Sequence, residues 1–248
     1  TEYQADRREL HFVVNETLQA GKLCEFPDFA EFDEEMFTMI INEASTFAEQ
    51  VLAPLNVNGD RQGCRIENGT VVTPDGFTEA WKQLGEGGWL SMSLPPEFGG
   101  QGIPELIAVI GKETQLAANQ GFTIGASLTT GAANLIYTFG SDVQKNEFCQ
   151  NMFSGKWAGT MCLTEPHAGS AVGDVITSAT KQEEGHYLIK GTKQFITNGD
   201  HDMADNIVHL LLARTPNSQQ GTKEISLFIV PEKMPDGEQN DIKLVSIE

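Results

Sequence analysis

Cysteine is scarce in this sequence, and the few cysteines stand far apart. There are four, at positions 24, 64, 149 and 162, with no C-x-x-C pair and no histidine at a zinc-finger spacing. This usage excludes a disulfide framework and a structural zinc site. We expect reduced thiols and a cytoplasmic location, with the mitochondrial matrix left open.

A long apolar run is absent as well. No stretch approaches the roughly 18–20 apolar residues that cross a bilayer, and the N-terminal residues are acidic and polar. We therefore expect neither membrane insertion nor a secretory signal.

Basic residues are few. The 248 residues hold 16 Lys and Arg against 35 Asp and Glu, which leaves a formal net charge of −19. This sign excludes nucleic acid and anionic lipid as partners, because both are polyanions. A hydrophobic content of 40% nevertheless indicates a packed core.

The first part of the chain has helical periodicity. From Glu34 to Ala53 the apolar side chains recur at steps of three and four, behind Asp33 as an N-cap. Pro54 is expected to end this helix. Further helices are predicted over residues 5–19, 75–86, 104–119, 122–139 and 142–153, the last opened by a capping box of Ser141 and Gln144.

After Gly155 the pattern changes to short β-rich segments separated by turn residues. Strands are predicted over residues 157–163, 175–182, 186–189, 194–197, 207–213, 225–230 and 243–248. The predicted fold class is α+β, with an all-α N-terminal domain over residues 1–155 and an antiparallel β-barrel or sandwich over residues 156–248. Because the last strand stops without a turn, we expect the β-domain to be truncated.

Two polar segments of the second part are candidate binding loops. MCLTEPHAGS (residues 161–170) leaves a strand and gathers hydroxyls, free backbone donors and a glycine, as the edge of a polar ligand requires. An ordinary Pro/Gly turn is the alternative interpretation. The second segment, GTKQFITNG, covers residues 191–199.

In this order, the two segments resemble the flavin-contacting segments of the acyl-CoA dehydrogenase family. The helical part, with LAPLN, PPEFGGQG and GSDVQKNEF, resembles that family's N-terminal domain. The combination of TEPHAG, GTKQF and HDMADNIVHLLLAR is most similar to the methylmercaptopropionyl-CoA dehydrogenase subgroup. The resemblance implies FAD as cofactor, an acyl-CoA substrate, and an electron-transfer flavoprotein or similar acceptor. It also implies a homo-oligomer and a C-terminal helical bundle that is missing here.

The resemblance assigns roles to single residues as well. The implied flavin contacts are the backbone of Met161 and Leu163, the hydroxyls of Thr164 and Thr197, and the ring of Phe195, while Ser170 would contact the CoA part of the substrate. Amides and hydroxyls suit a flavin that accepts a hydride at N5, because they tune it without titrating. No catalytic base is assigned, since the family's base would lie beyond residue 248, and Glu165 is expected to be structural.

Three positions depart from the commonest pattern of the family. His167 stands in place of Gly, Ala171 follows Ser170 in place of Asp, and Phe195 stands in place of Trp. A Phe ring still stacks on a flavin, with less area and no indole N–H. Whether His167 contacts substrate or flavin, or is a solvated loop residue, stays open.

Alternative functions and sites were weighed on the same residues. An acyl-CoA oxidase, or a flavin-binding interaction protein of the same fold without turnover, would share these segments. His201, Asp205 and His209 have helical spacing, but residues 207–212 are predicted to form a strand, which places these side chains differently, so we expect hydrogen-bonded histidines and no metal site. The glycines of residues 99–102 lack the Gly-Lys-Ser/Thr ending of a phosphate loop and indicate a turn.

Overall fold

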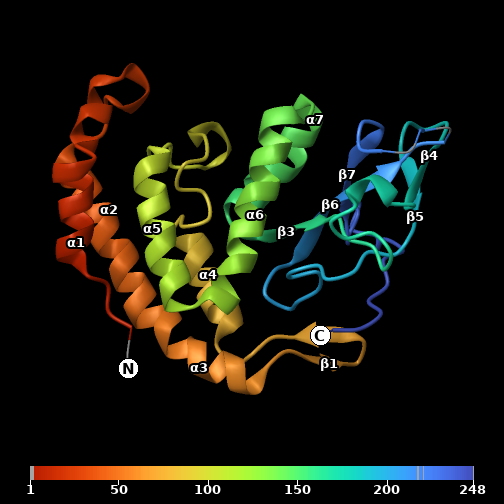
Figure 1. The fold of residues 1–248 in the computed structure, drawn as a ribbon, viewed down its shortest axis with the longest axis horizontal. Helices are drawn as coiled ribbons and strands as arrows, with labels where there is room; N and C mark the ends of the chain where they lie inside the picture. The colour runs from red at the N-terminus through yellow and green to blue at the C-terminus, as the bar shows by residue number, and fades with distance from the viewer. Residues whose placement is uncertain (1–2, 217, 220, 248) are drawn as a thin grey trace.

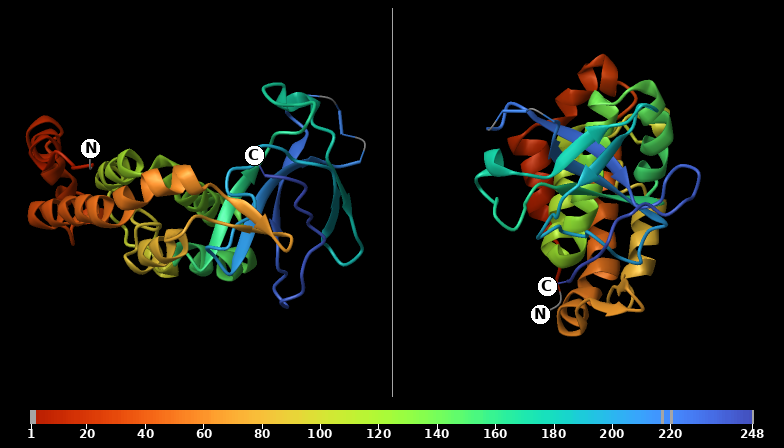
Figure 2. Two further views of the ribbon diagram at one scale, coloured as in Figure 1. Left: turned by 90° about the horizontal axis from the view of Figure 1, so that it is seen from below. Right: turned by 90° about the vertical axis from the view of Figure 1, so that its right-hand side faces the viewer.

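The computed structural model describes residues 3–216, 218–219 and 221–247. Its helices gather at one end of an elongated molecule and its main sheet lies at the other (Figures 1 and 2). The helices are α1 (Arg7–His11), α2 (Glu34–Phe47), α3 (Ala53–Gln62), α4 (Phe77–Glu86), α5 (Glu105–Ala118), α6 (Gln120–Phe139), α7 (Asp142–Gln144) and α8 (Gln150–Phe153). The strands are β1 (Arg65–Glu67), β2 (Thr70–Val72), β3 (Trp157–Cys162), β4 (Ser178–Lys181), β5 (Tyr187–Lys190), β6 (Asn206–Arg214) and β7 (Ile225–Pro231). Helices followed by a sheet confirm the α+β class.

The helix that begins behind Asp33 is longer than predicted. Asp33 caps it as expected, because its carboxylate accepts a hydrogen bond of 2.7 Å from the Met36 N–H. Pro54 does not end it: α2 continues through a π-helical turn (Ala48–Leu52) into α3. The π turn widens the backbone just ahead of the ring that would clash in a regular helix, so the chain remains helical to Gln62.

The other predicted helices are present with small shifts of their ends. Residues 142–153 form α7, a π-helical turn (Lys145–Cys149) and α8, opened by the predicted capping box of Ser141 and Gln144. The hairpin of β1 and β2 within the helical part was not predicted. It turns on Asn68 and Gly69, both at positive φ.

The main sheet is mixed rather than antiparallel. The strand order is β3-β6-β4-β5, with β7 also paired to β6. β6 runs parallel to β3 and β4 and antiparallel to β7. Among the described residues these five strands form no closed barrel. Two predicted strands are wrong, because residues 194–197 and 243–247 form no strand. The last residue of the second prediction, Glu248, lies outside the described residues.

Core side chains from the helices continue into the sheet. One buried cluster joins Trp81 of α4 and Phe122 of α6 to Ile207 of β6. The Trp81 indole N–H donates a 2.8 Å hydrogen bond to the Gly155 carbonyl, just before β3. Burial of large aromatic side chains is a major stabilising term, so this cluster fixes the sheet against the helices.

The closest contact between the two parts is that of α6 with β3. The Gly159 N–H donates to the Thr129 hydroxyl at 2.9 Å. Gly159 has no side chain, and a Cβ there would lie 2.8 Å from the Ala132 Cβ. Glycine thus permits a close approach of strand and helix. Within the described residues no helix has both the length and the hydropathy to cross a membrane.

Candidate functional site

The two segments singled out in the sequence lie against each other. The Gln194 N–H donates a 2.9 Å hydrogen bond to the Thr164 carbonyl, and the Lys193 ammonium donates one of 3.0 Å to the Leu163 carbonyl. Residues about 30 positions apart therefore form one site at the end of β3.

Backbone donors of β3 line one side of this site. Among the described strands, β3 pairs only with β6. Gly159 directs its N–H away from β6, toward Thr129 of α6. Alternate residues of a strand direct their backbone groups to the same side, so the N–H groups of Met161 and Leu163 lie on this open edge too. Two backbone N–H groups therefore face the same side here.

Two hydroxyls and one aromatic ring complete the predicted contacts. Thr164 is half-buried and Thr197 is exposed, and neither hydroxyl has a hydrogen-bond partner among the residues described. Phe195 is 63% exposed and has a φ of 58°. A bulky residue at positive φ costs on the order of 1–3 kcal/mol and occurs mostly at functional sites.

The loop after Thr164 is closed by its own backbone. Glu165 and Ala168 exchange two N–H···O bonds of 3.0 Å. This turn leaves Ser170 exposed. The His167 Nε2 lies 3.3 Å from the Asp174 carbonyl and 3.6 Å from the Glu165 carboxylate. His167 is therefore tied to the loop, and Ser170 is free to meet a ligand.

A buried ion pair, which sequence reasoning missed, lies behind the site. The Lys193 ammonium is 2.8 Å from a Glu165 carboxylate oxygen. The carboxylate also accepts from the Ile176 N–H at 2.8 Å and the Thr177 N–H at 3.1 Å. Burial opposes ionisation of Glu165, but the bonds from Lys193, Thr177 and Ile176 outweigh it and lower its pKa to about 2.

Two models of protein domains match the chain. The model of the acyl-CoA dehydrogenase N-terminal domain matches residues 34–156, and that of the acyl-CoA dehydrogenase middle domain matches residues 160–245. The chain belongs to the acyl-CoA dehydrogenase family.

Two curated relatives align with 99% of the chain. The 3-methylmercaptopropionyl-CoA dehydrogenase of Ruegeria pomeroyi is 38% identical over 252 residues, and a butyryl-CoA dehydrogenase of Syntrophomonas wolfei is 36% identical over 262 residues. The alignments take in 43% and 42% of these relatives, so the chain spans less than half of their length.

Solved structures of the family share the fold. A chain of the Acidaminococcus fermentans electron transferring flavoprotein structure has a TM-score of 0.67 at 30% identity, over 82% of this chain and 49% of that one. The glutaryl-CoA dehydrogenase of Mycobacterium smegmatis has a TM-score of 0.66 at 28% identity, over 83% and 48%. The acyl-CoA dehydrogenase of Bacillus anthracis complexed with FAD has a TM-score of 0.65 at 26% identity, over 82% and 32%.

Inside the sheet of this family member, His209 belongs to a buried polar cluster. Its Nδ1 lies 2.7 Å from the Thr160 hydroxyl and 3.7 Å from the Cys162 sulfur, and its Nε2 lies 3.8 Å from the Glu232 carboxylate. Burial opposes protonation, but Cys162 and the nearby Glu232 carboxylate stabilise the protonated ring and raise the pKa of His209 to about 9. The cluster lies on the face of β3 opposite to Met161, because successive side chains alternate.

The expectation of a hydrogen-bonded pair of histidines is only partly met. His201 accepts from the Met203 N–H through Nδ1, while its Nε2 and that of His209 are buried without a hydrogen-bond partner. Burial lowers the pKa of His201 to about 4. In the described part of the chain, no three His, Cys, Asp or Glu side chains are placed to hold a metal ion.

These shifts predict a stability optimum near neutral pH. The pKa of His209 is raised above its ordinary 6.5, so its contribution is complete below pH 6.5 and is lost as pH rises through about 9. The pKa of His201 is lowered, so its contribution is lost as pH falls from 6.5 toward 4. We expect the urea concentration at the unfolding midpoint to decrease as pH is raised from 7 to about 9.5, and to decrease less in the His209→Gln variant than in wild type. The matched control is His186→Gln, at an exposed histidine. An equal decrease in wild type and both variants would contradict the prediction.

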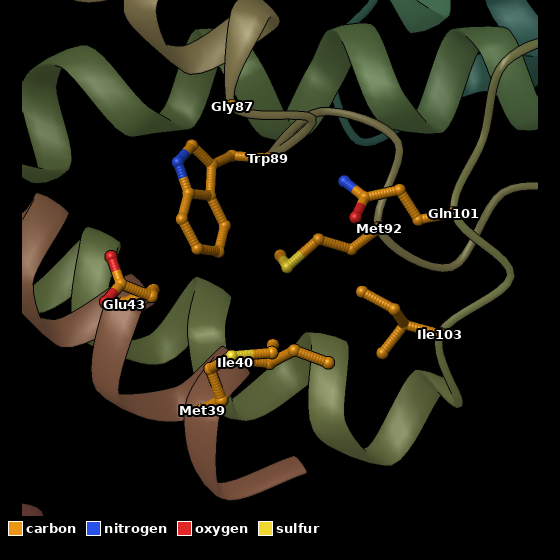
Figure 3. A pocket seen from close by; sticks show the side chains of 8 residues that line it. All are labelled: Met39, Ile40, Glu43, Gly87, Trp89, Met92, Gln101 and Ile103. Atoms are coloured by element: carbon orange, nitrogen blue, oxygen red, sulfur yellow. The ribbon is translucent and has the colours of Figure 1, made fainter. Parts of the chain in front are cut away.

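A pocket in the helical part is separate from these residues. It has a volume of about 250 Å³ and is lined by α2 and the loop before α5, through Met39, Ile40, Glu43, Gly87, Trp89, Met92, Gln101 and Ile103 (Figure 3). Met92 and Ile103 also belong to the buried cluster around Phe37 and Ile107. The pocket is thus the outer end of a helical core, and no predicted flavin contact lines it.

Proposed function

We propose that this chain is the N-terminal and middle part of an FAD-dependent acyl-CoA dehydrogenase, divided near residue 155. Its family and the names of its relatives support α,β-dehydrogenation of an acyl-CoA thioester. The observation that carries the proposal is the joining of two segments around unpaired donors at the open edge of β3.

The residues fit a flavin. In the proposal, the N–H groups of Met161 and Leu163 and the hydroxyl of Thr164 hold its pyrimidine and N5 edge. Phe195 covers the ring, and the Thr197 hydroxyl lies near N5. When bound, FAD supplies a hydride acceptor at N5. Fixed donors around a site of developing negative charge stabilise it without a reorganisation cost.

The chain also contributes to binding the substrate in this proposal. The exposed Ser170 contacts the CoA part, and the turn that ends at Ala168 sets its position. Glu165 is not assigned as the base, because a pKa of about 2 makes its carboxylate a weak proton acceptor and both of its oxygens are bonded. The base that removes the α-proton lies in a C-terminal domain beyond residue 248.

The remaining partners are proposed from the family alone. In this proposal, an electron-transfer flavoprotein or similar acceptor reoxidises the cofactor. A homo-oligomer of the full-length protein and a cytoplasmic location stay predictions.

Replacement of the two hydroxyls tests the proposal. In the full-length protein, Thr164→Val and Thr197→Val keep the side-chain shape and remove the hydrogen-bonding group. Each substitution is expected to weaken FAD binding by about 1–3 kcal/mol where a buried partner loses its hydrogen bond. Each is also expected to shift the flavin's absorption maximum and reduction potential. Visible spectroscopy and potentiometry measure both shifts, with the exposed Thr180→Val as control. An unchanged spectrum, FAD affinity and rate of reduction by acyl-CoA in the double variant would refute the site.

A further inference from the structure

The ion pair of Lys193 and Glu165 differs from a surface salt bridge. Its side chains are 8% and 1% exposed. Removing two charges from water is costly, and it is offset only when further hydrogen bonds satisfy both groups. Here the ammonium also bonds to the Leu163 carbonyl, and the carboxylate to two backbone N–H groups. Both charged groups therefore have hydrogen bonds beyond the ion pair itself.

Its bonds join three segments of chain. Through Leu163 and Glu165 the pair holds the residues on both sides of Thr164. Through Ile176 and Thr177 it holds the chain that enters β4. The neighbouring Gln194 N–H bonds to the Thr164 carbonyl itself. The Thr164 backbone is thus fixed before, at and after the residue.

The same pair anchors the second segment near its start. Lys193 lies two residues before Phe195 and four before Thr197. Asn198, at a φ of 53°, follows and packs on Gly125 of α6, where a Cβ would overlap its side chain. The second segment is consequently anchored at Lys193 and again at Asn198, with Phe195 and Thr197 between the two anchors.

We propose that Lys193 and Glu165 are positioning residues that set the separation between Thr164 and Thr197, and through it the affinity and reduction potential of the flavin. The inference rests on the proposed function of this site. Neither residue is assigned a contact with cofactor or substrate. They act by holding the two contacting segments at one distance, since small misplacements of such groups have large effects.

The experiment compares variants of the full-length protein. Lys193→Met removes the charge, Lys193→Arg keeps it, and Glu165→Gln weakens the pair while the Leu163 bond is retained. Lys82→Met is the matched control, because Lys82 forms an exposed ion pair with Glu86 at 3.9 Å in α4. For each protein, FAD affinity is measured by titration of the flavin-free form, together with the flavin potential and visible spectrum. Hydrogen exchange of the Ile176 and Thr177 amides is measured without flavin.

The expected result is a graded one. Lys193→Met weakens FAD binding by about tenfold or more and shifts the potential and spectrum, Lys193→Arg restores most of each, and Lys82→Met behaves as wild type. Exchange at the two amides increases in Lys193→Met even in the flavin-free protein. Folded Lys193→Met and Glu165→Gln proteins with wild-type affinity, potential and spectrum would overturn the inference. Failure of all three site variants to fold would overturn it too, because the pair would then serve folding itself. Wild-type protein that binds no FAD would instead refute the proposed function.

Discussion

The 248-residue chain produced by itself is expected to show no acyl-CoA dehydrogenation above background. Proton abstraction next to a thioester needs a carboxylate of suitable proton affinity, and a general base contributes roughly 10²–10⁴-fold to such a step. Glu165 is the single acid within the two segments proposed to contact the flavin. With a pKa of about 2 and hydrogen bonds to both of its oxygens, its carboxylate is too weakly basic for this role.

The dehydrogenation activity of the isolated chain is measured as reduction of an artificial electron acceptor in the presence of acyl-CoA. The full-length protein is the positive control and is expected to turn over, while the isolated chain is loaded with excess FAD so that weak binding does not hide activity. Titration of both proteins with FAD separates a lost base from a lost cofactor. Substrate-dependent reduction by the isolated chain would place the base within residues 1–248 and contradict its assignment to a further domain.

Much of the fold could be predicted from periodicity and capping. The helix behind Asp33 and the capping box of Ser141 are local signals, and the structure contains both. Strand direction cannot be predicted from the local sequence. β3 and β6 pair in parallel, and Trp157 and its partner Asn206 lie 49 positions apart. Alternation of polar and apolar residues in one strand carries no information about its neighbour. The prediction that Pro54 ends the helix was wrong because a π turn precedes it, and the hydrophobic pattern does not reveal such a turn.

The site was predictable in outline for a similar reason. The resemblance located both segments, yet it gave no reason to connect Glu165 with Lys193, 28 positions later. Residues 194–197 have strand-like composition, but Phe195 and Asn198 have positive φ values that no strand adopts. Bonds to Leu163 and Thr164 hold them in that conformation. Tertiary contacts therefore override local propensity at this loop.

The close contact between α6 and β3 predicts a large effect on stability when one methyl group is added at Gly159. In Gly159→Ala the new Cβ would lie 2.6 Å from Met152 Cε, 2.8 Å from Ala132 Cβ and 3.3 Å from Thr129 Cα. The Met152 side chain can move, but the other two atoms are fixed to the helix, so strand and helix must separate. We expect the free energy of unfolding to fall by about 2–3 kcal/mol. Urea denaturation followed by circular dichroism measures it.

Gly131→Ala is the matched control. Gly131 lies in α6, the helix that β3 contacts through Gly159, and a Cβ at Gly131 would meet no atom within 4 Å. Replacing glycine in an open helical position is expected to raise stability by about 0.5–1 kcal/mol. The two variants should therefore change stability in opposite directions. Because β3 also contains Met161 and leads into Leu163, Gly159→Ala should in addition weaken FAD binding by the full-length protein, while Gly131→Ala leaves it unchanged. Equal stability of the two variants would mean that β3 does not pack on α6 through Gly159.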